Sequence, residues 1–231
     1  MEGIKVIAFD ADDTLWINEP YFQEAEKKFC SLLEDYLPHH SISQELFKTE
    51  IQNLQLYGYG VKGFMLSMVE TAIRVSLHTV SPVIIEKAIS YGKELLDRPI
   101  ELLKGVEDVL HELKDKYRLV IATKGDLLDQ ERKLKKSGLS HYFHHIEIMS
   151  DKQEGDYRKL LRHLDIQPSQ FLMLGNSLKS DILPVLAIGG HAIHIPYHIT
   201  WSHETIEQKV EHEQFRQMER ISDIIPLLSP S

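Results

Sequence analysis

The clearest pattern in the sequence is a series of short apolar runs, the first of which covers residues 4–9 and is rich in β-branched side chains. A run of this kind, bounded by polar residues, predicts a strand that is buried on both faces. Similar runs lie at residues 119–122, 146–149, 171–174 and 192–195, and amphipathic stretches lie at residues 106–115, 127–137, 154–164 and 181–188. This alternation predicts an α/β fold with a doubly wound parallel sheet.

The pattern changes between about residues 20 and 97, where apolar positions recur at helical spacing and no convincing strand is present. Helices are predicted at residues 21–36, 43–57, 62–78 and 82–96. An interruption of about 80 residues is too long for a simple connection, because most connections between a strand and a helix have ~2–6 residues. We therefore expect an α/β core made of residues 1–17 and 98–231 and an all-helical cap made of residues 18–97. The cap would lie where open α/β sheets bind ligands.

Composition and charge narrow the class of protein. The chain has 231 residues, of which 42% are hydrophobic and 26% are charged, as is typical of a globular domain. A formal net charge of −9 argues against binding to nucleic acid or to an anionic membrane, and no apolar run reaches the ~18 residues of a membrane span. The single cysteine, Cys30, excludes an internal disulfide, and the first residues do not have the pattern of a signal peptide. We expect a cytoplasmic protein.

Three carboxylates follow the first predicted strand directly, in the sequence Asp10-Ala11-Asp12-Asp13. In a turn, the side chains of Asp10 and Asp12 can point toward one site, and the backbone N–H groups of the turn can bind an anion. Carboxylates this close repel one another unless a cation lies among them, and Mg²⁺ prefers oxygen ligands. An isolated pair of this spacing is also typical of an ordinary acidic turn or helix cap.

Polar residues also follow the next three predicted strands, in residues 123–125, 151–152 and 175–181. Each segment alone is ordinary, because Thr and Asn often begin helices and a lysine is usually on the surface. The carboxyl ends of parallel strands meet at one edge of a sheet, so the segments are expected to face the acidic turn. There, Lys152 would offset the charge of a transferring phosphoryl group.

These segments resemble the four motifs of the haloacid dehalogenase superfamily, which residues 10–15, Thr123, Lys152 and residues 175–181 match in order. The resemblance spans nearly the whole chain. The inserted helices resemble the type 1 cap of that superfamily, and the sheet resembles its Rossmann-like core. By this resemblance, Asp10 is the catalytic nucleophile and Asp12 is the general acid and base, with Thr123 and Lys152 as further catalytic residues.

The resemblance also implies the binding residues. The phosphoryl group would be bound by Thr123, Lys124, Lys152 and Ala11. A Mg²⁺ ion would be bound by Asp10, Asp12, Asn176 and Asp181. The sequence departs from the pattern at Asn176, where phosphatases of the superfamily usually have an aspartate. Whether Asn176 or Asp181 is the direct metal ligand is therefore left open.

The resemblance implies Mg²⁺-dependent hydrolysis of a small phosphomonoester through an aspartyl-phosphate on Asp10. An alternative is a 2-haloacid dehalogenase, in which the same nucleophile attacks carbon; Asn176 is compatible with it. That branch lacks an acid two residues after the nucleophile, so Asp12 argues against it. A signalling receiver has no place for the helical insertion. A non-catalytic regulatory protein, suggested by Asn176, is a further alternative.

The remaining features concern specificity and the C-terminal part of the chain. Candidates for substrate recognition in the cap are Tyr57, Tyr59, Lys62 and Arg74. The histidine-rich residues 191–203 mix strand and loop spacing, which argues against a histidine metal cluster, and Trp201 or His198 is a candidate for a contact with substrate or cap. Residues 204–219 are rich in charge and are predicted to form a helix with a solvated face.

Overall fold

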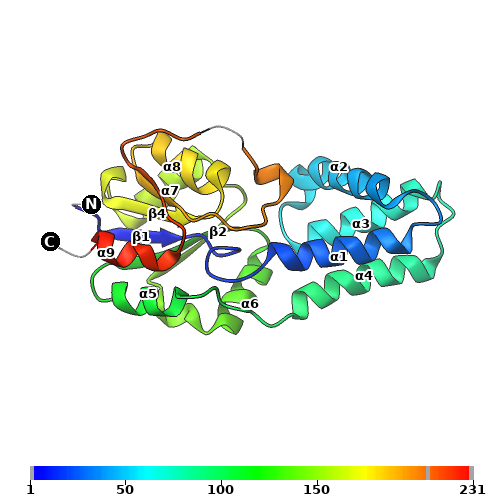
Figure 1. Cartoon of the computed structure of the whole chain (residues 1–231), viewed down its shortest axis with the longest axis horizontal. Coiled ribbons are helices and arrows are strands. Elements are labelled where there is room, and N and C mark those ends of the chain that lie inside the picture. The colour runs from blue at the N-terminus through cyan, green and yellow to red at the C-terminus, as the bar shows by residue number, and fades with distance from the viewer. Residues whose placement is uncertain (1–2, 207–208, 229–231) are drawn as a thin grey trace. The chain divides into compact units, whose positions relative to one another are not determined.

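The computed structural model describes residues 3–206 and 209–228, and its centre is a six-stranded sheet in the order β3-β2-β1-β4-β5-β6. Every neighbouring pair of strands is parallel, which confirms the predicted α/β sheet (Figure 1). The strands are β1 (Val6–Phe9), β2 (Arg118–Lys124), β3 (His145–Met149), β4 (Phe171–Gly175), β5 (His191–His194) and β6 (Phe215–Gln217). The C-terminal end of β1 therefore lies in the middle of one edge of the sheet.

Both faces of the sheet are covered, because successive side chains of a strand point to opposite faces. In β1, Ile7 and Phe9 belong to one apolar core, and Val6 and Ala8 belong to the other. The first core includes α5 (Val106–Leu113), α6 (Leu127–Ser137) and α9 (Ile224–Leu228), and the second includes α7 (Glu154–Leu164) and α8 (Leu183–Ala187). Figure 1 shows α5 and α9 on one side of the sheet and α7 and α8 on the other. The predicted doubly wound arrangement is confirmed.

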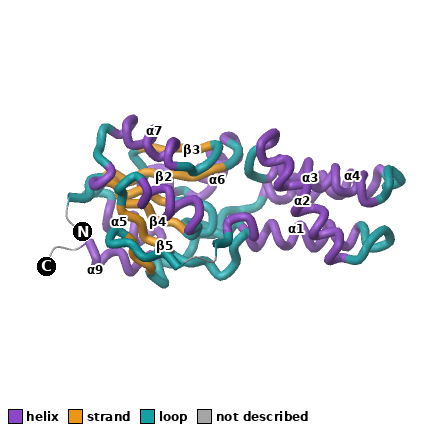
Figure 2. Tube along the Cα trace, turned by 90° about the horizontal axis from the view of Figure 1, so that it is seen from above, coloured by secondary structure: helices purple, strands orange, loops and turns teal. Residues whose placement is uncertain are grey.

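The insertion after β1 is helical, as predicted, and consists of α1 (Glu19–Leu32), α2 (His39–Tyr57), α3 (Val61–Val75) and α4 (Pro82–Asp97). Figure 2 shows these helices running alongside one another. They enclose an apolar core of their own, in which Phe29, Leu46 and Met68 are fully buried. The helix α4 begins with a side-chain cap, because the Ser81 hydroxyl accepts the N–H of Val83.

The chain divides into two compact units. One contains Met1–Glu19, Ile100–Lys124 and Gln130–Ser231, and the other contains Pro20–Pro99 together with Gly125–Asp129. Single short turns complete the first unit: η1 (Leu139–Tyr142), η2 (Pro168–Gln170), η3 (Leu178–Ile182), η4 (Ser202–Glu204) and η5 (Ile221–Asp223). In the described part of the chain, every helix is too short or too polar to cross a membrane.

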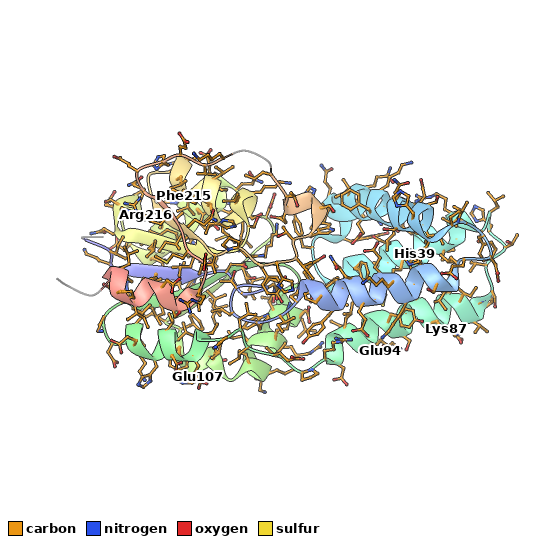
Figure 3. The ribbon with its side chains drawn as sticks, viewed as in Figure 1. His39, Lys87, Glu94, Glu107, Phe215 and Arg216 are labelled. Carbon is orange, nitrogen blue, oxygen red and sulfur yellow. The ribbon has the colours of Figure 1, made fainter. Side chains whose placement is uncertain are left out.

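The prediction of a charged helix over residues 204–219 is wrong. The described residues of that stretch contain the end of η4 and the strand β6, and Figure 3 labels Phe215 and Arg216 on β6. Ala192 of β5 is paired with Phe215, and Phe215 packs against the second apolar core. The physical reason is that a charged stretch without an apolar stripe gains little as a helix, whereas the edge of β5 offers backbone hydrogen bonds.

The register of the central strands determines which residues lie at the functional edge. Phe9, the last residue of β1, is paired with Ile121 on one side and with Leu174 on the other. Because the strands are parallel, β1, β2 and β4 end at the same edge of the sheet, although β2 continues to Lys124 and β4 to Gly175. This is the arrangement that the sequence predicts for the acidic turn and the segments after β2 and β4.

Candidate active site

Asp10 is the first residue after β1, and its carboxylate is held by a lysine that follows β3. The backbone N–H of Asp10 donates to the carbonyl oxygen of Leu174 at 2.8 Å, which attaches the turn to β4. Lys152 Nζ donates to Asp10 Oδ1 and, at 2.7 Å, to Asp181 Oδ1. The Thr14 hydroxyl donates to Asp10 Oδ2 at 3.2 Å. The structure thus brings together the predicted residues Asp10, Lys152 and Asp181.

This cluster of two carboxylates and one ammonium group is buried. Burial is the largest influence on Asp10 and raises its pKa; the carboxylate of Asp181 adds to this effect and the ammonium of Lys152 opposes it. Burial lowers the pKa of Lys152, but the carboxylates of Asp10 and Asp181 outweigh it and raise that pKa. Lys152 therefore stays charged, and the ionised cluster keeps one negative charge that a further cation would neutralise.

The side chain of Asp12 is surrounded by hydrogen-bond donors. It accepts bonds from Lys133 Nζ at 2.6 Å, from Trp16 Nε1 at 2.7 Å and from Gln130 Nε2 at 2.9 Å. Burial raises the pKa of Asp12, but the ammonium of Lys133 and the three hydrogen bonds outweigh it and hold the pKa below its usual value. Asp12 is therefore a carboxylate in this conformation. A carboxylate can act as a general base. To act as a general acid, Asp12 must first take up a proton on an oxygen that now accepts one of these hydrogen bonds.

Gln130 and Lys133 are site residues that the sequence analysis did not identify. They lie three positions apart on α6, and Gln130 Nε2 is also within hydrogen-bond distance of the Thr123 hydroxyl (3.2 Å) and of the Lys124 carbonyl oxygen (2.8 Å). The amide of Gln130 thus joins Asp12 to the end of β2. Polar residues three positions apart occur on any solvated helix, so the sequence contained no signal for this contact.

The amide of Asn176 lies near both the carboxylate of Asp10 and the backbone carbonyl of Asp12. The amide of Asn176 has one atom at 3.2 Å from Asp10 Oδ2 and at 3.3 Å from the backbone oxygen of Asp12. With nitrogen at that position, the amide donates to both oxygens. With oxygen there, it lies about 3 Å from an oxygen of Asp10 and from the carbonyl oxygen of Asp12, which is the separation of adjacent ligands around an octahedral Mg²⁺ with bonds of about 2.1 Å. Asp10, Asn176 and the backbone of Asp12 therefore fit a Mg²⁺ ion.

Asp181, the other candidate metal ligand, is held away from solvent by its neighbours. Its exposed fraction is 1%, and its carboxylate accepts bonds from Lys152 and from the backbone N–H of Ser177 (3.0 Å). A Cβ atom at Gly175 would lie 2.1 Å from Asp181 Oδ2, so this close approach requires glycine. Among the described residues, no three or more His, Cys, Asp or Glu side chains gather as a metal site. An amide and a backbone carbonyl are therefore needed to complete a ligand set, and the direct role of Asp181 stays a prediction.

Lys124 and Thr123, which were expected to bind phosphate, lie at the C-terminal end of β2. Thr123 is 2% exposed, and Lys124 Nζ donates to Ser180 Oγ at 2.9 Å and to the carboxylate of Glu204. Ala11 lies in the turn after Asp10, and its carbonyl oxygen accepts the N–H groups that close this turn. Glu204, expected on a solvated helix, is buried beside Lys124 instead. The phosphate-binding roles of Thr123, Lys124 and Ala11 stay predictions.

The recognition candidates of the cap contact neighbours inside the helical unit. Side-chain bonds run from Tyr57 to Glu70 (2.8 Å), from Lys62 to Asp126 (3.0 Å) and from Arg74 to Glu45 (2.9 Å). The first and third contacts join α2 to α3, and the second joins α3 to the segment Gly125–Asp129. Recognition of substrate by these three side chains and by Tyr59 stays a prediction.

The chain matches a known family and a solved structure. The family described as haloacid dehalogenase-like hydrolase matches residues 4–189. A haloacid dehalogenase-like family hydrolase from Xanthomonas campestris is 37% identical, with 95% of this chain and 88% of that chain covered and a TM-score of 0.86. The chain therefore belongs to the haloacid dehalogenase-like hydrolases. No curated protein matches it.

More distant structures share the fold. The HAD hydrolase YfnB from Bacillus subtilis, bound to magnesium, is 16% identical with a TM-score of 0.68, and 99% of this chain and 100% of that chain are covered. A predicted phosphoglycolate phosphatase from Haemophilus somnus is 19% identical with a TM-score of 0.65 and the same coverage. Structures described as dehalogenases match at similar levels. The fold is thus common to proteins named for both activities.

The Lys152→Met substitution should lower the free energy of unfolding by about 3–5 kcal/mol, because it leaves the carboxylates of Asp10 and Asp181 buried without their cation. Urea denaturation in the presence of a metal chelator measures this loss. The control is Lys159→Met: Lys159 is 62% exposed and pairs with Asp156 at the surface, so its loss should cost less than about 1 kcal/mol. If the two variants were equally stable, Lys152 would not be the cation that stabilises the buried carboxylates of Asp10 and Asp181.

Proposed function

We propose that this hydrolase cleaves a small phosphomonoester with Mg²⁺ as cofactor and forms an aspartyl-phosphate on Asp10. The observation that supports the proposal is the pair of carboxylates after β1. Asp10 is held by Lys152, which also binds Asp181, while Asp12, two residues on, is held separately by Lys133 and its other donors. Two carboxylates in different environments are suited to different roles, one as nucleophile and one as acid and base.

In the first step, a carboxylate oxygen of Asp10 attacks phosphorus, and the bond from phosphorus to the ester oxygen breaks. The leaving oxygen takes a proton from Asp12, which must enter this step as a carboxylic acid. Substrate binding must therefore displace one of the donors that now face Asp12. The ammonium of Lys152, already in contact with Asp10, offsets negative charge on the transferring group.

In the second step, Asp12 is a carboxylate and accepts a proton from a water molecule, whose oxygen attacks phosphorus. The bond between phosphorus and Asp10 breaks, which releases inorganic phosphate and restores the carboxylate. The donors from Lys133, Trp16 and Gln130 suit this form of Asp12. A Mg²⁺ ion held by Asp10, Asn176 and the Asp12 carbonyl would supply positive charge beside the phosphoryl oxygens.

The second candidate function is 2-haloacid dehalogenation with Asp10 as the nucleophile on carbon. Asn176 favours it, because a neutral amide contributes no charge for binding a divalent cation. Asp12 argues against it, since a departing halide needs no proton. The three donors that contact the Asp12 side chain support a role for this residue in proton transfer.

Replacement of Asp10 tests the proposal directly. The Asp10→Asn variant should keep its fold and lose turnover on a panel of phosphate esters with millimolar Mg²⁺, because an amide is a far weaker nucleophile than a carboxylate. The same change at the exposed Asp115 is the control and should leave turnover unchanged. Normal activity of the Asp10 variant would overturn the mechanism. A wild-type protein without activity on phosphate esters and on 2-haloacids would instead indicate a non-catalytic role.

Replacement of Asp12 separates its two roles. The Asp12→Asn variant should form the aspartyl-phosphate ~10²–10⁴-fold more slowly from an alkyl phosphate, whose leaving group needs a proton. With 4-nitrophenyl phosphate the loss in this first turnover should be much smaller, because nitrophenolate leaves without a proton. Rapid-mixing kinetics measures the first turnover with each ester. An equal loss with both esters would show that Asp12 is not the general acid.

Replacement of Asn176 tests its assignment as a metal ligand. The Asn176→Asp variant should bind Mg²⁺ more tightly, because it adds a negative charge beside Asp10, and the Asn176→Ala variant should bind it more weakly. Isothermal titration calorimetry measures both affinities without substrate. Unchanged Mg²⁺ affinity in both variants would place Asn176 outside the ligand set.

A further inference from the structure

Glu204 is a buried carboxylate that no part of the proposed chemistry uses. It lies beyond residue 189, where the match to the family ends, and its exposed fraction is 9%. Its Oε1 accepts a hydrogen bond from Lys124 Nζ. Its Oε2 accepts bonds from the hydroxyls of Ser177 (2.5 Å) and Ser180 (2.6 Å). The carboxylate therefore connects the end of β2 to the turn after β4.

Ser177 links Glu204 to the candidate metal site through hydrogen bonds. Its hydroxyl, which donates to Glu204, also accepts the backbone N–H of Ser180 at 3.0 Å. Its own backbone N–H donates to Asp181 Oδ2 at 3.0 Å, and its carbonyl oxygen accepts the N–H of Asp181 at 2.9 Å. Asn176 is the preceding residue. The hydroxyl that contacts Glu204 thus belongs to the residue that orients Asp181 and adjoins Asn176.

Two further contacts hold the same turn from the C-terminal side. Lys179 Nζ donates to the carbonyl oxygen of His203, the neighbour of Glu204, at 2.8 Å. His194 Nε2, at the end of β5, is 3.0 Å from the carbonyl oxygen of Asn176. Residues 194–204 therefore contact the turn of residues 175–181 at several points, and Glu204 supplies the charged contact.

The surroundings of Glu204 favour its ionised form. Burial raises the pKa of Glu204, but the ammonium of Lys124 and the hydrogen bonds from Lys124, Ser177 and Ser180 outweigh burial and lower the pKa to about 2. An amide at this position would place its nitrogen either against the ammonium of Lys124 or against the two hydroxyls. In the first orientation the bond from Lys124 is lost. In the second the two hydroxyls must accept instead of donate, and both orientations lack the negative charge.

We propose that Glu204 is a positioning residue for metal binding: through Ser177 it fixes the turn of residues 175–181 so that Asn176 and Asp181 face Asp10. The catalytic consequence rests on the proposed function, because the turn would hold Mg²⁺ for phosphoryl transfer. The positioning itself is a property of the turn and is measurable without substrate. Removal of a side chain that orients a metal ligand typically weakens metal binding by 10–100-fold.

The test measures Mg²⁺ affinity by isothermal titration calorimetry on the full chain. The Glu204→Gln variant keeps the size of the side chain and removes its charge, and its dissociation constant for Mg²⁺ should rise about 10–100-fold. The control is Glu211→Gln, because Glu211 is an exposed glutamate that pairs with Lys209 in the same part of the chain. Its Mg²⁺ affinity should equal that of the wild type.

A second variant distinguishes positioning from simple stabilisation of Lys124. Ser177→Ala removes one of the two hydroxyl links to the turn and keeps the bonds from Lys124 and Ser180 to Glu204. The unfolding temperature in a chelator should fall only by the loss of the bond from the Ser180 N–H to the Ser177 hydroxyl, while Mg²⁺ affinity falls. This variant decides the question if Glu204→Gln does not fold. Unchanged Mg²⁺ affinity in Ser177→Ala, or a wild-type chain that binds no Mg²⁺, would overturn the inference.

Failure of the proposed function gives a different result. A wild-type chain that binds Mg²⁺, loses affinity on Glu204→Gln and hydrolyses none of the phosphate esters would retain the positioning role of Glu204 and reject the phosphatase assignment. If the esters are hydrolysed, millimolar Mg²⁺ should partly restore the activity of Glu204→Gln. A loss of kcat that no Mg²⁺ concentration restores would contradict a role through the metal.

Discussion

The ammonium group of Lys152 lies between the carboxylates of Asp10 and Asp181, and the rest of the site depends on this contact. The three residues come from the loops after β3, β1 and β4, so one buried cation joins three strand ends. Without it, two carboxylates would be buried side by side, which is costly unless they take up protons. With Lys152 in place, its ammonium opposes the rise that burial causes in the pKa of Asp10 and so favours the ionised form that a nucleophile requires.

A second constraint is that the two aspartates of the acidic turn have separate partners. Asp10 faces Lys152 and the amide of Asn176, whereas the Asp12 side chain faces Lys133, Trp16 and Gln130. The backbone carbonyl oxygen of Asp12 nevertheless lies 3.3 Å from an amide atom of Asn176. One residue can therefore contribute a backbone oxygen to a metal site and a side chain to proton transfer.

The sequence predicted the parts of this architecture that depend on local pattern. The first apolar run became the buried strand β1, and the polar segments at successive strand ends met at one edge because the sheet is parallel. The sequence did not predict the contacts of Gln130, Lys133 and Glu204, which depend on how distant segments pack. Glu204 shows the reason most clearly: its neighbours predicted a solvated helix, and only the folded chain places it against Lys124 and Ser177.

The central claim is that Asp10 is the residue that becomes phosphorylated. The Asp12→Asn variant offers the most direct measurement, because loss of the general base slows hydrolysis of the intermediate while nitrophenolate can still leave. After mixing with 4-nitrophenyl phosphate and Mg²⁺ and quenching in acid, mass spectrometry of the proteolysed protein should find one phosphoryl group on Asp10. A phosphoryl group on another residue, or nitrophenolate release in a first turnover with no phosphorylated protein, would contradict the account.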